Sequence, residues 1–326
     1  MDSLTVPTYD NLPLGDDGVA SAWGLFGAED SIGRLNLITP ETVRDATQLV
    51  RRGVSFGLDA PVDEFDPPLD TTRSGARHRV LRGGTDGVED LDDVLDDYFP
   101  QISSQWDSLA HMAARPNVFY NNRTVDDILI GGRNTIDHWT KRGVVTRAVL
   151  LDLPRARELA PDVVPDASHG PVSVSVEVLE VVRAVTGTDF SPGCAVVIRT
   201  GFLEWYRGLD QERRVALSAN LTAPGLEHSE DMARYLWDSG ASAVVSDSFA
   251  TEVWPPDESP QGAPFGFLHR VLIGRLGFAI GELWDLEELA RDCAADGVYE
   301  FLPVSYTHLR RKRPWRHFTG SWSVAR

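Results

Sequence analysis

The feature that most constrains the fold is a pair of uninterrupted apolar runs in the second half of the chain. Residues 147–152 (RAVLLD) and 195–199 (AVVIR) have the length of β-strands, and polar and apolar positions do not alternate in them. Such runs are typical of strands buried on both faces of a sheet. Between them, residues 176–184 have the spacing of an amphipathic helix and end near Gly187. The order strand, helix, strand predicts an α/β protein.

The same alternation continues along most of the chain. Further helices are predicted at 40–52, 210–218, 229–239, 269–276 and 285–297, a short helix opens at Thr124, and further strands are predicted at 243–246 and 278–280. Asp285 and Glu288 have the spacing of a capping box. No repeat or linker divides the chain. We therefore expect an N-terminal arm at 1–20, one domain at 21–305 and a basic C-terminal tail at 306–326.

Charge and composition exclude several kinds of partner. The chain has 31 basic and 49 acidic residues, a formal net charge of −18 and a pI near 4.8. Such a field repels nucleic acid and anionic membranes. No secretory signal or apolar window of membrane-spanning length is readable. The two cysteines, Cys194 and Cys293, belong to no CxxC pair, which suits a reducing compartment. We expect a cytoplasmic protein.

Common catalytic motifs are missing from the sequence. Lys141 and Lys312 are the only lysines, and both lie in polar surroundings. No GxxxxGK[ST], GxGxxG or GxSxG string occurs. This argues against Schiff-base chemistry, nucleotide hydrolysis, dinucleotide redox chemistry and α/β-hydrolase serine chemistry.

The densest polar constellation is residues 101–111, QISSQWDSLAH. If this segment is extended, Gln105 and Asp107 share one face. His111 lies four residues after Asp107 and comes within reach if the chain turns there. A carboxylate beside an imidazole fixes its tautomer and raises its basicity, as a general base requires. From spacing alone, such an Asp–His pair is more often structural than catalytic.

The segment resembles the signature of the cyclase family, which includes bacterial kynurenine formamidases, isatin hydrolases and some polyketide ring cyclases. That signature runs His-x-Gly-Thr-His-x-Asp-x-Pro-x-His. Its two first histidines fall on Gln101 and Gln105, its aspartate on Asp107 and its last histidine on His111. SSQWD…H followed by FYN at 119–121 resembles a longer subgroup of the family.

The resemblance covers about residues 21–305 and implies a fold. It predicts a single α/β domain of the formamidase and cyclase type, the swivelling β/β/α fold, with a mixed sheet core flanked by helices. It also implies that the chain assembles as a homodimer or homotetramer. The basic stretch after Ser305 departs from the family pattern.

The two glutamines put the family's metal site in doubt. In metal-dependent members both signature histidines bind the ion, and a later His and Glu complete the site; these fall on His269 and Glu282. A neutral amide is a far poorer zinc ligand than imidazole. Either an ion such as Mn²⁺, Mg²⁺ or Zn²⁺ binds to Asp107, Gln105, His269 and Glu282, or no ion is bound and the amides contact the substrate. We favour the metal-free site.

These residues predict an enzyme that acts on a carbonyl of a small cyclic or cyclisable metabolite. The leading hypothesis is hydrolysis of a lactone, ester or activated amide, with His111 as general base and Asp107, Gln105, His269 and Glu282 in the catalytic site. Ring closure or dehydration of a polyketide-like product is one alternative, and a non-catalytic ligand-binding paralogue is another. The predicted substrate-binding residues are Gln101, Ser104, Trp106, Phe119, Tyr120 and Asp247.

Overall fold

A ten-stranded mixed sheet forms the centre of the molecule. The computed structural model describes residues 6–306, 317–318 and 321–326, so the basic run at 310–316 lies outside the described residues. The strand order is β1-β14-β12-β6-β8-β10-β11-β4-β13, and β5 pairs with β12. The strands of this sheet are β1 (Ser55–Gly57), β4 (Gln105–Asp107), β5 (Val144–Val145), β6 (Ala148–Asp152), β8 (Ala195–Arg199), β10 (Ala243–Ser246), β11 (Ala279–Glu282), β12 (Glu300–Tyr306), β13 (His317–Phe318) and β14 (Ser321–Ala325).

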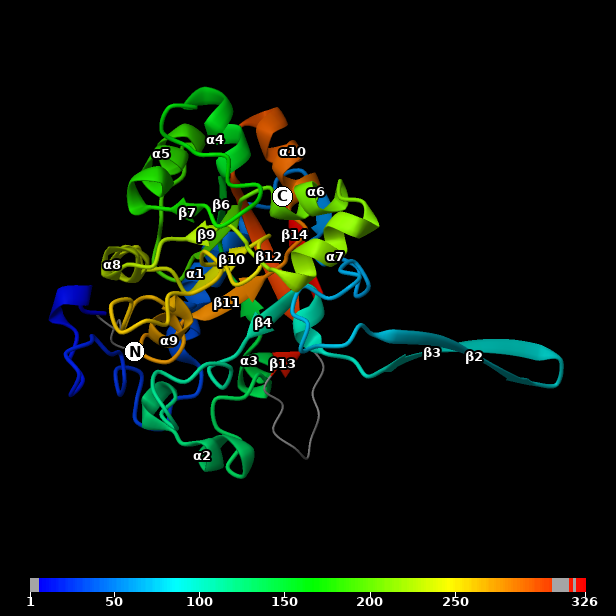
Figure 1. The fold of residues 1–326 in the computed structure, drawn as a ribbon, viewed down its shortest axis with the longest axis horizontal. Helices are drawn as coiled ribbons and strands as arrows, with labels where there is room; N and C mark the ends of the chain where they lie inside the picture. The colour runs from blue at the N-terminus through cyan, green and yellow to red at the C-terminus, as the bar shows by residue number, and fades with distance from the viewer. Residues whose placement is uncertain (1–5, 307–316, 319–320) are drawn as a thin grey trace.

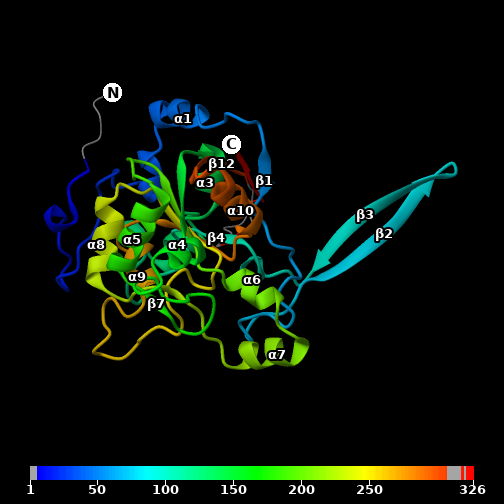
Figure 2. The ribbon, with the colours of Figure 1, turned by 90° about the horizontal axis from the view of Figure 1, so that it is seen from above.

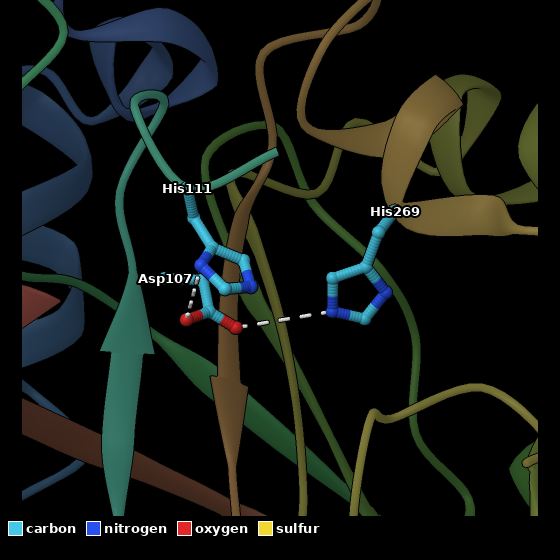
Figure 3. Close-up of side chains that lie close together, drawn as sticks. All are labelled: Asp107, His111 and His269. Atoms are coloured by element: carbon cyan, nitrogen blue, oxygen red, sulfur yellow. Dashed lines mark ion pairs between the residues drawn. The ribbon is translucent and has the colours of Figure 1, made fainter. Parts of the chain in front are cut away.

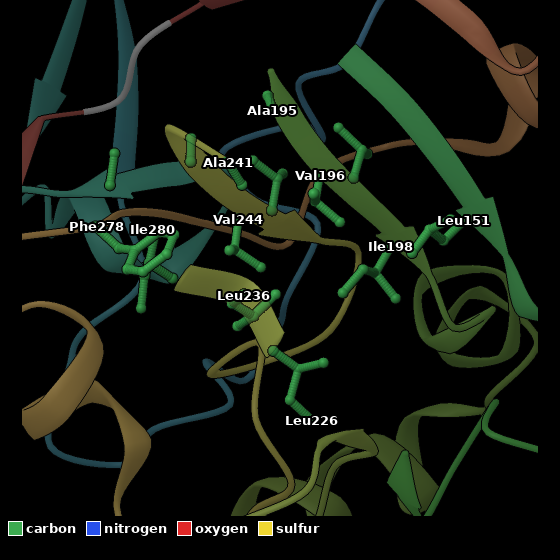
Figure 4. Packing of buried hydrophobic residues seen from close by; sticks show 14 of the residues in the cluster. Leu151, Ala195, Val196, Ile198, Leu226, Leu236, Ala241, Val244, Phe278 and Ile280 are labelled. Atoms are coloured by element: carbon green, nitrogen blue, oxygen red, sulfur yellow. The ribbon is translucent and has the colours of Figure 1, made fainter. Parts of the chain in front are cut away.

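The four central strands, β6, β8, β10 and β11, are parallel. Every residue in them is buried, which explains why their sequences do not alternate. Figure 4 shows Val196, Ile198, Val244 and Ile280 from these strands packed among other buried side chains. The predicted α/β class with a mixed sheet is thus confirmed.

Helices flank this sheet (Figures 1 and 2). Their bounds are α1 (Pro40–Thr47), α2 (Val125–Leu129), α3 (Asp137–Arg142), α4 (Leu153–Leu159), α5 (Val176–Thr186), α6 (Phe202–Arg207), α7 (Gln211–Ala219), α8 (Glu230–Asp238), α9 (Leu268–Leu272) and α10 (Glu287–Asp296). Helix α5 contacts β6, α4 and α8, and α8 also contacts α9, so these four helices form one layer.

Local sequence signals explain several helix ends. Thr39 caps α1, and Ser175 caps α5 by accepting from the Val178 N–H. Gly187 ends α5 in the left-handed region, at φ 63°. The capping box predicted from Asp285 and Glu288 is wrong: α10 starts at Glu287 and has no side-chain cap.

A long β-hairpin leaves the body of the molecule. Strands β2 (Arg77–Thr85) and β3 (Val88–Asp96) pair in antiparallel register with each other only. Figures 1 and 2 show this hairpin projecting far from the sheet. Asp86 and Gly87 form its turn with φ of 57° and 77°, as a two-residue type I′ turn requires. Charged residues in both strands hide the alternating pattern, so the hairpin is not evident in the sequence.

The C-terminus also differs from the expected tail. Residues 321–325 form β14, which lies between β1 and β12 in the central sheet. The end of the chain is therefore part of the fold rather than an appendage. A further small sheet joins β7 (Ser173–Val174) to β9 (Gly225–Leu226).

Candidate active site

Strands β4 and β11 bring the first site residues together. They pair antiparallel, with Gln105 opposite Glu282 and Asp107 opposite Ile280. Because side chains alternate along a strand, Gln105 and Asp107 lie on the same face, as predicted. The Gln105 Nε2 donates a hydrogen bond to Glu282 Oε2 at 2.7 Å. Both side chains are buried, so this bond is shielded from water.

His111 reaches the same place through a turn. Its backbone N–H donates to the carbonyl of Ser108 at 2.8 Å, and this turn returns the imidazole towards the end of β4. The Nδ1 of His111 is 3.7 Å from Asp107 Oδ1. The Asp107 side chain is 0% exposed, whereas that of His111 is 20% exposed. His111 is therefore the member of this pair that solvent or a substrate can reach.

His269 approaches Asp107 from the opposite side. It lies in α9, and its Nε2 is 3.8 Å from Asp107 Oδ2 and 3.1 Å from Glu282 Oε1. Figure 3 shows one imidazole near each oxygen of the Asp107 carboxylate, with His111 at Oδ1 and His269 at Oδ2. Their ring centroids are 6.1 Å apart. Segments far apart in the sequence thus place two imidazoles around one buried carboxylate.

Glu252 fixes the orientation of His269, and sequence reasoning did not identify this role. Its carboxylate accepts from the backbone N–H of His269 at 2.8 Å and of Leu268 at 2.5 Å, and it bonds to His269 Nδ1. His228 Nε2 also lies 2.9 Å from it. A carboxylate on Nδ1 leaves the Nε2 of His269 to face Asp107 and Glu282.

The electrostatics of the site reflect three buried carboxylates around one imidazole. Burial alone would lower the pKa of His269, but interactions with Asp107, Glu252 and Glu282 raise it well above its ordinary value. Burial raises the pKa of Glu282, and repulsion by Asp107 raises it further. Negative charge therefore exceeds positive charge inside this site, and such an excess is costly unless a proton or cation offsets it.

Three residues of the site could hold a metal ion. Asp107, His111 and His269 each offer one ligand atom, and these atoms lie within 4.8 Å of one another. Two imidazoles and one carboxylate form a donor set suited to transition metals and zinc. This set differs from the predicted one, because His111 replaces Gln105 and Glu282. The residues present fit a divalent ion.

The two glutamines contribute differently. The Oε1 of Gln105 is buried and has no hydrogen-bond partner among the described residues, while its Nε2 is used by Glu282. Gln101 is also buried, and its Nε2 likewise lacks a partner in the described part of the chain. Its backbone carbonyl accepts from Arg73. Gln105 is thus part of the Asp107 constellation, and Gln101 is a buried neighbour of it in the sequence.

Several predicted substrate-binding residues support the fold instead. Ser104 is buried and bonds to the backbone of Ala60 and Leu283. Trp106 is 3% exposed and packs edge-on against Trp139 and Trp284. These contacts leave neither side chain open to a ligand.

Asp247 and the aromatic pair also differ from prediction. Both oxygens of Asp247 accept from the loop after β8, from Thr200 and the Gly201 N–H, at 2.7–2.8 Å. Tyr120 is fully buried and donates to Asp30 at 3.1 Å. Phe119 is half-buried beside it. None of the three belongs to the group around Asp107.

A pocket of about 450 Å³ adjoins this group. One wall is the segment 112–116, which directly follows His111, and the other comes from residues 257–270. The ring of Phe267 in this wall lies 5.5 Å from that of His269, measured between centroids. The lining residues thus adjoin both histidines along the chain, although neither histidine itself lines the pocket.

The fold and this site define an α/β protein in which two imidazoles and a buried carboxylate form a candidate catalytic or metal-binding group. The model of the Cyclase family, described as "Putative cyclase", matches residues 80–253, which is more than half of the chain. The protein belongs to this family.

Solved structures agree with this assignment. A crystal structure described as that of a novel cyclase has a TM-score of 0.80 and 26% identity, covering 94% of this chain and 99% of that one. Isatin hydrolase A from Labrenzia aggregata, bound to benzyl benzoate, has a TM-score of 0.54 and 12% identity over 86% of this chain and 95% of that one. An isatin hydrolase bound to the product analogue thioisatinate has a TM-score of 0.55 and 12% identity, covering 88% and 99%. The two isatin hydrolases share the fold.

No curated protein matches the chain. Among the described residues, no helix has the length and apolar character needed to cross a membrane.

Proposed function

We propose that this protein is an enzyme that acts on a carbonyl group of a small cyclic or cyclisable metabolite. The proposed reaction is hydrolysis of a lactone, ester or activated amide. The observation that carries the proposal is the convergence of His111, His269 and Asp107 beside a pocket of substrate size. Titratable groups gathered around a buried carboxylate at a pocket are typical of catalytic sites. The isatin hydrolases with the same fold support a hydrolytic reaction.

His111 is the proposed general base. It is the partly exposed member of the group, so a water molecule or substrate hydroxyl can reach its ring. Asp107 beside it stabilises the protonated imidazole and so favours proton uptake. A positioned general base contributes about 10²–10⁴-fold to the rate. That gain suits an activated ester or lactone better than an unactivated amide.

The same residues would hold a divalent ion. In that form Asp107, His111 and His269 are its ligands, and Glu252 keeps the Nε2 of His269 directed inward. A bound ion supplies Lewis-acid polarisation and lowers the pKa of bound water to about 7. Glu282 is then the carboxyl left to hold a proton, because burial and Asp107 raise its pKa. The metal-free site predicted from the two glutamines is the alternative form.

Metal analysis of the purified protein decides between these two forms. The protein is dialysed against a chelator, its metal content is measured, and hydrolysis of an aryl ester is followed before and after adding Mn²⁺, Mg²⁺ or Zn²⁺. Activity that survives complete removal of metal supports His111 acting alone. One tightly held ion per chain, together with loss of activity on its removal, contradicts the metal-free form. A protein without hydrolytic activity in either state contradicts the proposed function.

Ring closure is the second candidate reaction. The crystal structure with 26% identity is described as that of a cyclase, and the same base and polar groups serve proton abstraction from an enolisable ketone. Product analysis separates the two reactions, because hydrolysis incorporates oxygen from ¹⁸O-labelled water and a cyclisation with loss of water does not. A soluble homodimer or homotetramer in the cytoplasm remains part of the proposal.

A further inference from the structure

The walls of the pocket beside His111 are mainly apolar, but they carry four charged residues. Met112, Pro116, Pro264 and Phe267 are among its apolar lining, and the charged residues are Arg115, Asp257, Glu258 and Arg270. A pocket of this composition holds an apolar body and uses its few polar groups to orient a ligand. The partners of each charge therefore indicate which one is available to a ligand.

Three of these charges are already engaged. Arg270 pairs with Glu258, and its guanidinium also lies 5.3 Å from the centre of the Phe267 ring. Asp257 accepts a hydrogen bond from the Ser259 N–H at 3.0 Å. Arg270 and Glu258 thus neutralise each other, and Asp257 caps its own loop.

Arg115 is different. It is half-buried in the pocket wall, and its guanidinium forms no ion pair or side-chain hydrogen bond with any residue in the described ranges. Most arginines of this acidic chain pair with a carboxylate, including Arg123 and Arg133 in the following segment. A partly desolvated guanidinium has five donors in a planar fork, which fits a carboxylate with two parallel hydrogen bonds.

We propose that Arg115 binds a carboxylate of the substrate, so that the site acts on esters or lactones that carry a free acid group. This inference rests on the proposed hydrolytic function and names its substrate class. Arg115 lies four residues after His111, on the wall that follows it in the chain. An acid group held there places the rest of a small molecule in the pocket, whose lining begins one residue after His111 and includes Phe267 and Arg270 on either side of His269 in the chain. The local cation also offsets the repulsion that a net charge of −18 exerts on anions.

A matched pair of aryl esters tests this inference. The mono-4-nitrophenyl ester of glutaric acid has a terminal carboxylate, and 4-nitrophenyl pentanoate has the same chain length and no charge. The wild type is expected to prefer the acid ester, mainly through a lower KM. Arg115→Ala is expected to lose about 10–100-fold in kcat/KM on the acid ester, the size of a lost hydrogen bond to a charged group, and about two-fold or less on the neutral ester.

The controls separate binding from folding. Arg115→Lys keeps the charge and is expected to restore part of the preference. Arg291→Ala removes an exposed arginine in α10, away from the pocket lining, and should leave both rates unchanged. Equal loss on both esters in Arg115→Ala assigns Arg115 a structural role and overturns the proposal. A wild type without preference for the acid ester also overturns it.

A binding measurement keeps this inference separate from the proposed function. Glutarate itself is expected to raise the melting temperature of the wild type and of Arg291→Ala, but not of Arg115→Ala. If neither ester is hydrolysed and glutarate still binds through Arg115, the function fails and the anion site stands. If the esters are hydrolysed and glutarate binds equally to Arg115→Ala, the anion site fails and the function stands.

Discussion

Gln105 donates from its Nε2 to Glu282 Oε2 across β4 and β11, at 2.7 Å, in a place closed to solvent. A neutral amide thus serves as the hydrogen-bond donor to a buried carboxyl group. The other oxygen, Oε1, lies 3.1 Å from His269 Nε2, so each oxygen of the Glu282 carboxyl group has a partner.

The first prediction concerns this bond. Gln105→Ala is expected to lower the free energy of unfolding by about 1–3 kcal/mol, because it leaves a buried oxygen of Glu282 without its donor. Urea denaturation measures the change. Gln101→Ala is the matched control: the side-chain Nε2 of Gln101 has no partner among the described residues, so a smaller loss is expected. Equal losses in the two variants would contradict the importance of the Gln105–Glu282 bond.

The second prediction distinguishes a catalyst from a binding protein. His111→Ala is expected to reduce turnover of an aryl ester by about 10²-fold or more, since a general base contributes at least that much. Glutarate should still raise the melting temperature of the variant, because the pocket wall at Arg115 is unchanged. Unchanged turnover would mean that the imidazole takes no part in the reaction, and absence of turnover in the wild type would favour the non-catalytic paralogue.

The third prediction is a pH dependence of stability. Burial alone would raise the pKa of Glu252, but hydrogen bonds with His228 and His269 and from the Leu268 N–H lower it below its ordinary value. A lowered pKa means that the fold stabilises the ionised carboxylate. Its contribution is thus present above the ordinary glutamate pKa of about 4.3 and is lost as the pH falls through the lower folded value.

Comparison with Glu252→Gln measures this contribution. The difference in free energy of unfolding between wild type and variant is expected to be constant near neutral pH and to shrink below about pH 4. Glu258→Gln, on the exposed pocket rim, should give a small difference throughout. A difference that grows on acidification would show that the pKa of Glu252 is raised rather than lowered.

The fourth prediction concerns the β2–β3 hairpin. Arg77 and Asp96 face each other at its base, so an Asn-Gly link between them can replace the projecting part. Removing the projecting part of the hairpin is expected to change the free energy of unfolding of the rest of the protein by about 1 kcal/mol or less, since a two-stranded hairpin alone is marginally stable. Ile198→Ala in buried β8 should cost about 2–5 kcal/mol. If shortening the hairpin lowered the free energy of unfolding as much as Ile198→Ala does, the hairpin would have to pack against another surface.

The fifth prediction is the oligomeric state. The family resemblance implies a homodimer or homotetramer of the 35.9 kDa chain. Sedimentation velocity at several concentrations measures the mass directly. A single species with the mass of one chain would contradict this prediction.

Local sequence signals predicted the centre of the fold well. Residues 147–152 and 195–199 became β6 and β8, because a strand buried on both faces needs an unbroken apolar run. The helical spacing of residues 176–184 and the glycine at 187 predicted α5 and its C-terminal end. The position of β14 between β1 and β12 could not be predicted in this way, because it depends on pairing between distant segments.

The residues of the candidate site were likewise predicted only in part. Alternation along an extended segment predicted that Gln105 and Asp107 would share a face, and the family signature pointed to His111, His269 and Glu282. Glu252 and Arg115 were missed, because their roles depend on how the segments 247–269 and 111–119 turn in space. The aromatic residues were assigned to a pocket by their proximity in sequence, whereas Trp106 and Tyr120 serve the core.

The Asp86–Gly87 turn at the far end of the hairpin has a practical use. It joins two strands that pair only with each other and lies well away from the central sheet. A peptide tag or fluorophore inserted there would report on the protein without disturbing the group around Asp107. The same turn is also where an exogenous protease should first cut the native chain.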